Sequence, residues 1–74
     1  MYLRTEGVIL KRRNFGEADR ILTIYTRDYG KVICLAKGVR RPRSKKAGHL
    51  ELGSWCKIFA VHGKNLDQIG RAHV

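Results

Sequence analysis

The sequence predicts an all-β fold, a small barrel of five short strands. Short apolar runs rich in β-branched residues recur along the 74 residues, and turn-forming residues separate them. The chain has no internal repeat and no second composition regime, so it is read as one domain. The longest connection falls between the third and fourth predicted strands. This pattern is typical of a five-stranded Greek-key barrel of the OB-fold type.

The first two strands come from the apolar runs nearest the N-terminus. Thr5–Arg13 holds the run Val8-Ile9-Leu10, and Gly7 disfavours a helix there. Residues 14–19 carry the turn formers Asn, Gly and Asp. Arg20–Thr26 is the second predicted strand. Its residues divide between two faces, Leu22, Ile24 and Thr26 on one and Ile21, Thr23 and Tyr25 on the other.

The remaining strands follow with shorter turns. Residues 27–30 predict a tight hairpin in which Gly30 takes a positive φ. Lys31–Ala36 and Ser54–Val61 are the third and fourth strands, and a fifth begins within Leu66–Ile69.

The end of the sequence continues none of these patterns. Its last letters, I-G-R-A-H-V, resemble the translation of a common sequencing-library adapter. We therefore expect a domain over residues 1–68, a non-native tail over residues 69–74, and a fifth strand that is incomplete.

The composition indicates a polyanionic partner. Lys and Arg number 16 against 6 acidic residues, which gives a formal charge of +10. Nucleic acid is the leading partner and an anionic membrane surface the weaker one. No apolar stretch is long enough to cross a bilayer and no secretion signal is present, so we expect a cytoplasmic protein. Cys34 and Cys56 are expected to be buried and reduced, with a disulfide as the minority alternative.

Two groups of cations are the candidate nucleic-acid contacts. One ends the first strand, and the other lies in the connection K-G-V-R-R-P-R-S-K-K after the third strand. The alternative is a solvated charge run with no partner. The candidate residues are Lys11, Arg12, Arg13, Arg40, Arg41, Arg43, Lys45 and Lys46.

Aromatic residues are interleaved with these cations. Phe15 and Tyr25 are the candidate platforms for stacked bases, whereas Trp55 and Phe59 share a strand parity and are expected in the core. The sequence contains no evident motif for recognising base edges, so we expect weak sequence selectivity in nucleic-acid binding.

Catalytic interpretations find no support in the sequence. The acidic residues are scattered, the histidines lack metal-site spacing, and neither cysteine carries the signature of an activated nucleophile. No phosphate-binding glycine loop is present. We expect a binding protein without cofactor, metal or small-molecule substrate.

Three segments taken in order resemble one family. T-E-G-V-I-L-K-R-R, then G-E-A-D-R-I-L-T-I-Y-T-R-D-Y-G-K, then A-K-G-V-R-R-P-R-S are similar to the N-terminal domain of the bacterial recombination mediator RecO. The resemblance covers about residues 1–68 and implies an OB-fold that binds single- and double-stranded DNA and is nucleoid-associated. It also implies strand annealing and recombinase loading, with RecR and single-strand-binding protein as partners. The DNA contacts would fall on the cations of the first and third segments.

At its C-terminus this sequence differs from the pattern of the family. The family continues into a helical domain, often with a zinc site, that this sequence does not contain. Two other functions also fit the residues alone. One is an RNA-binding OB or SH3-like module of the translation machinery, and the other is a basic domain that docks an acidic peptide.

Overall fold

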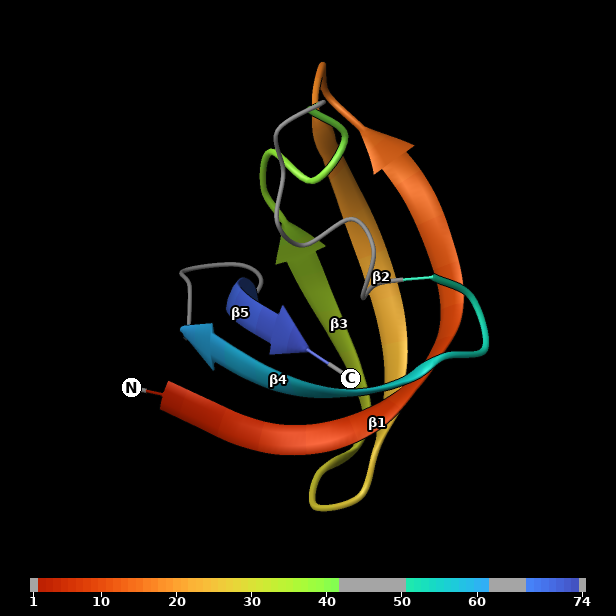
Figure 1. Cartoon of the computed structure of the whole chain (residues 1–74), viewed down its shortest axis with the longest axis vertical. Coiled ribbons are helices and arrows are strands. Elements are labelled where there is room, and N and C mark those ends of the chain that lie inside the picture. Colours follow the sequence, from red (N-terminus) through yellow and green to blue (C-terminus); the bar gives the residue numbers. More distant parts are fainter. Residues whose placement is uncertain (1, 42–50, 62–66, 74) are drawn as a thin grey trace.

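The computed structural model of the protein describes residues 2–41, 51–61 and 67–73. These residues form five strands and no helix, joined as a closed barrel in the order β1-β2-β3-β5-β4 (Figure 1). The predicted five-stranded all-β barrel is therefore confirmed, and it is consistent with an OB-fold. The strands are β1 Tyr2–Phe15, β2 Asp19–Thr26, β3 Gly30–Ala36, β4 Trp55–Val61 and β5 Asp67–His73.

Strand β1 is the longest strand, and its two halves pair with different neighbours. Its first half, residues 2–8, pairs with β4, and its second half, residues 7–15, pairs with β2. Strand β5 closes the other side between β3, to which it is parallel, and β4. Figure 1 shows β1 curving across the molecule from one partner to the other.

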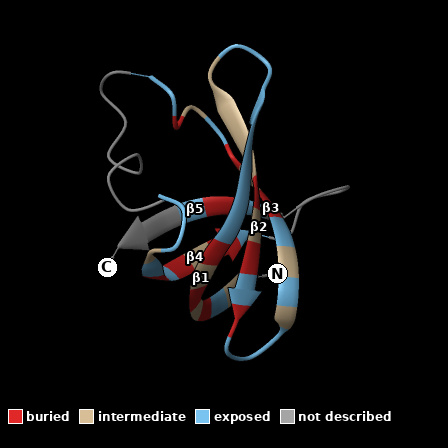
Figure 2. Cartoon of the chain, turned by 90° about the vertical axis from the view of Figure 1, so that its right-hand side faces the viewer, coloured by how far each residue is buried: buried red, intermediate tan, exposed pale blue. Residues whose placement is uncertain are grey.

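The core follows from alternation along the strands. Ile9, Leu22 and Ile24 are at most 1% exposed, and Figure 2 shows buried and exposed segments alternating along the ribbon. Cys34 and Cys56 are buried and are not joined in a disulfide, as expected, and desolvation raises the pKa of Cys56. The whole cluster of buried residues comprises Ile9, Leu22, Ile24, Cys34, Ala36, Val39, Cys56, Ile58 and Ile69.

Strands β1 and β5 exceed their predicted bounds by the most residues. β1 exceeds Thr5–Arg13 at both ends because pairing with two partners extends it. β5 runs beyond Ile69, whose side chain is fully buried. The prediction that residues 69–74 are non-native stays a prediction. Their pairing in β5 shows where they lie, and it does not show whether they belong to the natural sequence.

The turn between β2 and β3 is fastened to β1. The Thr5 hydroxyl donates to Asp28 Oδ2 at 2.7 Å, and the Arg27 amide donates to the Glu6 carbonyl at 2.8 Å. Gly30 has a φ of 69°, which confirms the positive φ predicted for this turn. These bonds fix one end of the barrel.

Gly7 marks the closest approach of two strands. A Cβ at this position would lie 2.3 Å from the Tyr25 carbonyl oxygen and 2.9 Å from Thr26 Cα. We predict that Gly7→Ala lowers the free energy of unfolding by about 1–3 kcal/mol, because backbone must move to admit the methyl group. Urea denaturation followed by circular dichroism measures it.

Gly70→Ala is the matched control for this substitution. Its Cβ would lie 3.5 Å from the Phe59 ring and carbonyl oxygen, an ordinary contact distance. This variant is expected within about 0.5 kcal/mol of the parent. Equal stability of the two variants would contradict the close approach at Gly7.

The ionised carboxylate of Asp28 is expected to stabilise the folded state, and this stabilisation is lost in acid. The Thr5 hydroxyl and then the Arg27 guanidinium stabilise its carboxylate and lower the pKa of Asp28 below its usual value near 3.8. This contribution is complete above the unfolded-state pKa and is lost as the pH falls through the lower folded-state pKa. The melting temperature of Asp28→Asn is therefore expected to fall less than that of the parent between pH 5 and about pH 2. Parallel thermal melts across that range provide the comparison, and curves of the same shape would refute it.

Candidate nucleic-acid interface

The segment after β3 folds back onto the turn between β1 and β2. The Arg40 amide donates to the Ala18 carbonyl at 2.9 Å, and the Gly38 amide donates to Asp19 Oδ1 at 2.7 Å. Gly38 has a φ of 71°, which permits the bend. The end of β1 and the start of the basic connection therefore lie at one end of the barrel (Figure 1).

A β-bulge determines how the cations of β1 point. Thr5, Gly7 and Ile9 face the interior, and unbroken alternation would turn Lys11 and Arg13 inward as well. The register shift between Ile9 and Lys11 reverses this. Lys11 and Arg13 are exposed, and they pair with Thr23 and Ile21 on the outer face of the barrel. That part of the predicted basic surface is brought together.

Arg12 points the other way. It pairs with Leu22, a core residue, so its side chain leaves β1 on the opposite face from Lys11 and Arg13. Its guanidinium forms an ion pair with Glu51 at 2.5 Å. The three consecutive cations of the sequence are thus split between two faces.

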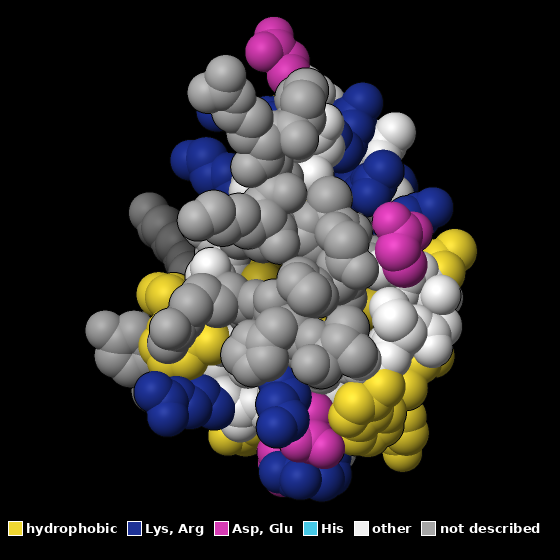
Figure 3. All heavy atoms as spheres, in the orientation of Figure 1, with side chains coloured by type: hydrophobic (Ala, Val, Ile, Leu, Met, Phe, Trp, Pro, Cys, Tyr) yellow, Lys and Arg dark blue, Asp and Glu magenta, His cyan; other side chains and the backbone are white. Residues whose placement is uncertain are grey.

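The basic connection is described only as far as residue 41. Arg40 and Arg41 are both exposed, and Arg40 Nη1 donates to the Gly16 carbonyl at 3.2 Å. Figure 3 shows Lys and Arg side chains gathered around the upper end of the molecule. The other predicted contacts, Arg43, Lys45 and Lys46, lie outside the described residues, as do the rest of residues 42–50.

Aromatic side chains occupy the outer face beside these cations. Val8 pairs with Tyr25 on one side and with Trp55 on the other, and the two rings are 60% and 48% exposed. Phe15, 49% exposed, has the strand parity of Lys11 and Arg13. Both predicted stacking residues are therefore exposed on the side of the β1 cations.

The expectation that Trp55 and Phe59 lie in the core is wrong. Cys56, Ile58 and Ala60 face the interior of β4, so the odd positions point outward. Phe59 is half-buried beneath Arg4, whose guanidinium carbon is 5.3 Å from the ring centroid. The available signal was Lys57, a charged and exposed residue that shares the strand parity of Trp55 and Phe59 and so marks that face as the outer one.

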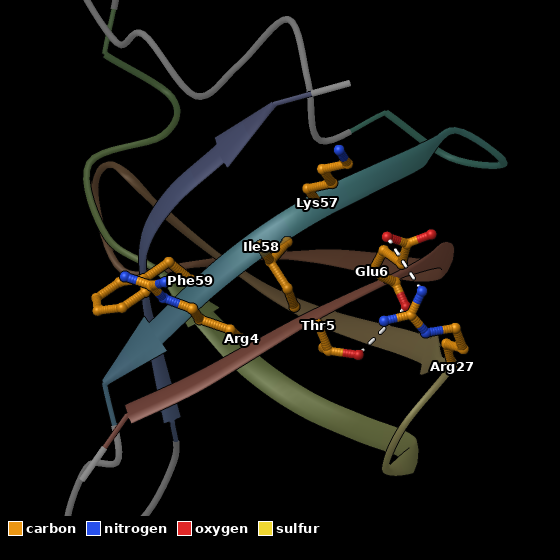
Figure 4. A pocket seen from close by; sticks show the side chains of 7 residues that line it. All are labelled: Arg4, Thr5, Glu6, Arg27, Lys57, Ile58 and Phe59. Carbon is orange, nitrogen blue, oxygen red and sulfur yellow. Dashed lines mark hydrogen bonds and ion pairs between the residues drawn. The ribbon is translucent and has the colours of Figure 1, made fainter.

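A surface cavity of about 460 Å³ lies elsewhere, along β1 and β4 near the β2–β3 turn (Figure 4). Of its three cations, Arg27 is ion-paired, with the lining residue Glu6 at 3.5 Å and with Asp28 outside the cavity at 3.3 Å. None of the predicted contacts lines it. Its lining residues are Arg4, Thr5, Glu6, Arg27, Lys57, Ile58 and Phe59.

The described parts of the chain contain neither a cluster of metal ligands nor a membrane-spanning helix. There, no three His, Cys, Asp or Glu residues come together in a group suited to a metal ion. No helix in these segments is long and apolar enough to cross a membrane.

Comparisons with known proteins identify the family. The family model "Recombination protein O N terminal" matches residues 1–74. The DNA repair protein RecO of Rubrobacter xylanophilus is 49% identical over 69 residues, which cover 93% of this chain and 28% of that protein. RecO of Bifidobacterium adolescentis is 48% identical over 67 residues, 90% of this chain and 27% of that protein. RecO of Acetivibrio thermocellus is 38% identical over 73 residues, 99% of this chain and 29% of that protein.

The chain therefore spans less than a third of the length of the curated relatives that it matches. The match begins at residue 1 and corresponds to the N-terminal part of the family. This protein belongs to the RecO family of DNA repair proteins.

Proposed function

We propose that this chain is the DNA-binding module of a RecO protein and holds single- and double-stranded DNA by its phosphates. The single observation that carries the proposal is a pair of cations, Lys11 and Arg13, that have no acidic partner among the described residues and that the bulge in β1 places on the outer face. A charge of +10 on 74 residues supports it, because such an excess favours a polyanionic partner.

The contacts divide into two kinds. Lys11, Arg13 and Arg41 have no acidic partner among the described residues, so they are available to phosphates without breaking a bond of the fold. Arg12 and Arg40 are held by Glu51 and the Gly16 carbonyl, and DNA has to compete for them. The first kind supplies affinity, because each phosphate neutralised releases counterions.

Phosphate contacts position a protein on DNA without reading its sequence. We propose weak sequence selectivity on this ground, and a role in binding rather than catalysis. Membership of a DNA repair family favours DNA over the RNA of a translation module and over an acidic peptide.

The wider activities belong to the longer protein. We propose that the complete protein anneals complementary strands and assists recombinase loading, with RecR and single-strand-binding protein as partners, and that it acts at the nucleoid. These assignments rest on membership of the RecO family, and the proposed phosphate contacts at one end of the barrel would give annealing a surface on which to bring two strands together.

A salt titration tests the proposal. We predict that Lys11→Gln with Arg13→Gln weakens binding of single-stranded DNA to a similar degree for all sequences. The slope of log K against log salt should become shallower by about 1.4, from two lost phosphate contacts at about 0.7 each. Fluorescence anisotropy of a labelled oligonucleotide at several salt concentrations gives the slope.

The matched control removes the same charge from another surface. Arg4→Gln with Lys57→Gln changes two cations that line the cavity along β1 and β4. Its slope is expected to stay at the parent value. If the control slope falls as far as that of the Lys11 and Arg13 variant, the contacts are not localised and the proposed interface is wrong.

A further inference from the structure

We infer that Trp55 and Tyr25 form a stacking face, an exposed surface on which unpaired bases of single-stranded DNA lie against the two rings. The inference rests on the proposed function and adds to it a means of telling single strands from duplex. A base within a duplex is already stacked and paired, so its face is not available to a protein ring.

The register places the two rings on opposite sides of a single residue. Val8 of β1 is opposite Trp55 of β4 and opposite Tyr25 of β2, so the three side chains form a row across the sheet. Directly opposed side chains leave a sheet on the same face. Trp55 and Tyr25 lie one strand away from β1 on either side, so their Cα atoms are about 10 Å apart, which is two interstrand spacings.

Packing does not account for these exposed rings. The buried cluster is assembled without either ring, and Trp55 and Tyr25 remain 48% and 60% exposed. Leu10 and Ile33, 50% and 49% exposed, come from the bulge and from the neighbouring strand β3. Hydrophobic side chains gather at the lower right of Figure 3, on the side where Figure 1 shows β1 and β2. Grouped exposed apolar side chains of this kind mark an interaction surface.

The charges beside the rings favour a nucleic acid as the occupant. Lys31 is opposite Tyr25 and continues the row, and Lys11 lies in the next row, opposite Thr23. This row and the next two on the outer face contain no acidic residue among those described. Rings with cations on the same face match a single strand, whose bases stack while its phosphates meet Lys and Arg. The three rows are Trp55, Val8, Tyr25 and Lys31; Lys11, Thr23 and Ile33; and Arg13, Ile21 and Leu35.

Trp55 also provides the measurement, because it is the one tryptophan of the sequence. The 74-residue chain is titrated with oligothymidylate and separately with a duplex of the same length, while tryptophan fluorescence and oligonucleotide anisotropy are followed. Single strands are expected to quench the emission, and the duplex is expected to bind without comparable quenching.

Substitutions locate the effect. Trp55→Ala and Tyr25→Ala should each weaken single-strand binding by about 5- to 150-fold, the range that corresponds to one lost base stack. Duplex binding should change less than twofold. Trp55→Phe keeps a ring and should retain most of the affinity. Tyr29→Ala is the control, because Tyr29 is 56% exposed but lies in the β2–β3 turn and belongs to none of the three paired rows. Circular dichroism melts verify that each variant is folded.

The outcomes separate this inference from the function on which it depends. If the folded Ala variants bind single strands as tightly as the parent, with the parent's salt slope, the stacking face is overturned and the DNA-binding function stands. An equal loss for single strand and duplex also overturns it, because the rings would then serve the backbone. Emission that shifts with protein concentration alone would assign the face to a second copy of the chain. A parent chain that binds neither form of DNA overturns the proposed function itself.

Discussion

The double pairing of β1 is the constraint on which the rest of the structure depends. Gly7 is opposite Cys56 of β4 and opposite Thr26 of β2, so one residue takes part in both ladders. The neighbouring backbone is close enough that a Cβ would collide with it. This crossing closes the barrel and sets the direction in which the second half of β1 leaves. The bulge that follows then turns Lys11 and Arg13 outward.

Acidic side chains are used mostly to hold the fold, which leaves an excess of cations for a partner. Asp28 accepts the Thr5 hydroxyl, Asp19 accepts the Gly38 amide, and Glu51 pairs with Arg12. Charges near the β2–β3 turn are thereby compensated within the protein. The outer face beside the β1–β2 turn has Lys11 and Arg13 without such compensation among the described residues. A partner that brings phosphates lowers the self-repulsion of this surface.

The sequence predicts those parts of the fold that depend on local patterns. The pattern of Arg20–Thr26 located β2 and separated its two faces, and the turn residues located the hairpin that follows. The bulge has no comparable signal, because an extra residue such as Leu10 is defined only against a distant partner strand. For that reason the sequence predicts one cluster of cations over Lys11, Arg12 and Arg13. In the structure Arg12 lies on the opposite face of β1 from the other two. The side of Trp55 was misjudged because its large ring outweighed the alternation of the smaller residues on β4.

One strand connects the two proposed kinds of contact with a nucleic acid. Before the bulge, β1 contributes Val8 at the centre of the row between Trp55 and Tyr25, and after it the same strand contributes Lys11 and Arg13. Stacking and phosphate binding are therefore fixed relative to each other by a single paired element and not by a loop. Because loops reorder on binding at an entropic cost, a surface carried on a paired strand presents its rings and charges in place. A duplex can satisfy only the charges, whereas a single strand can satisfy both, and this difference gives the barrel a physical basis for distinguishing the two forms of DNA.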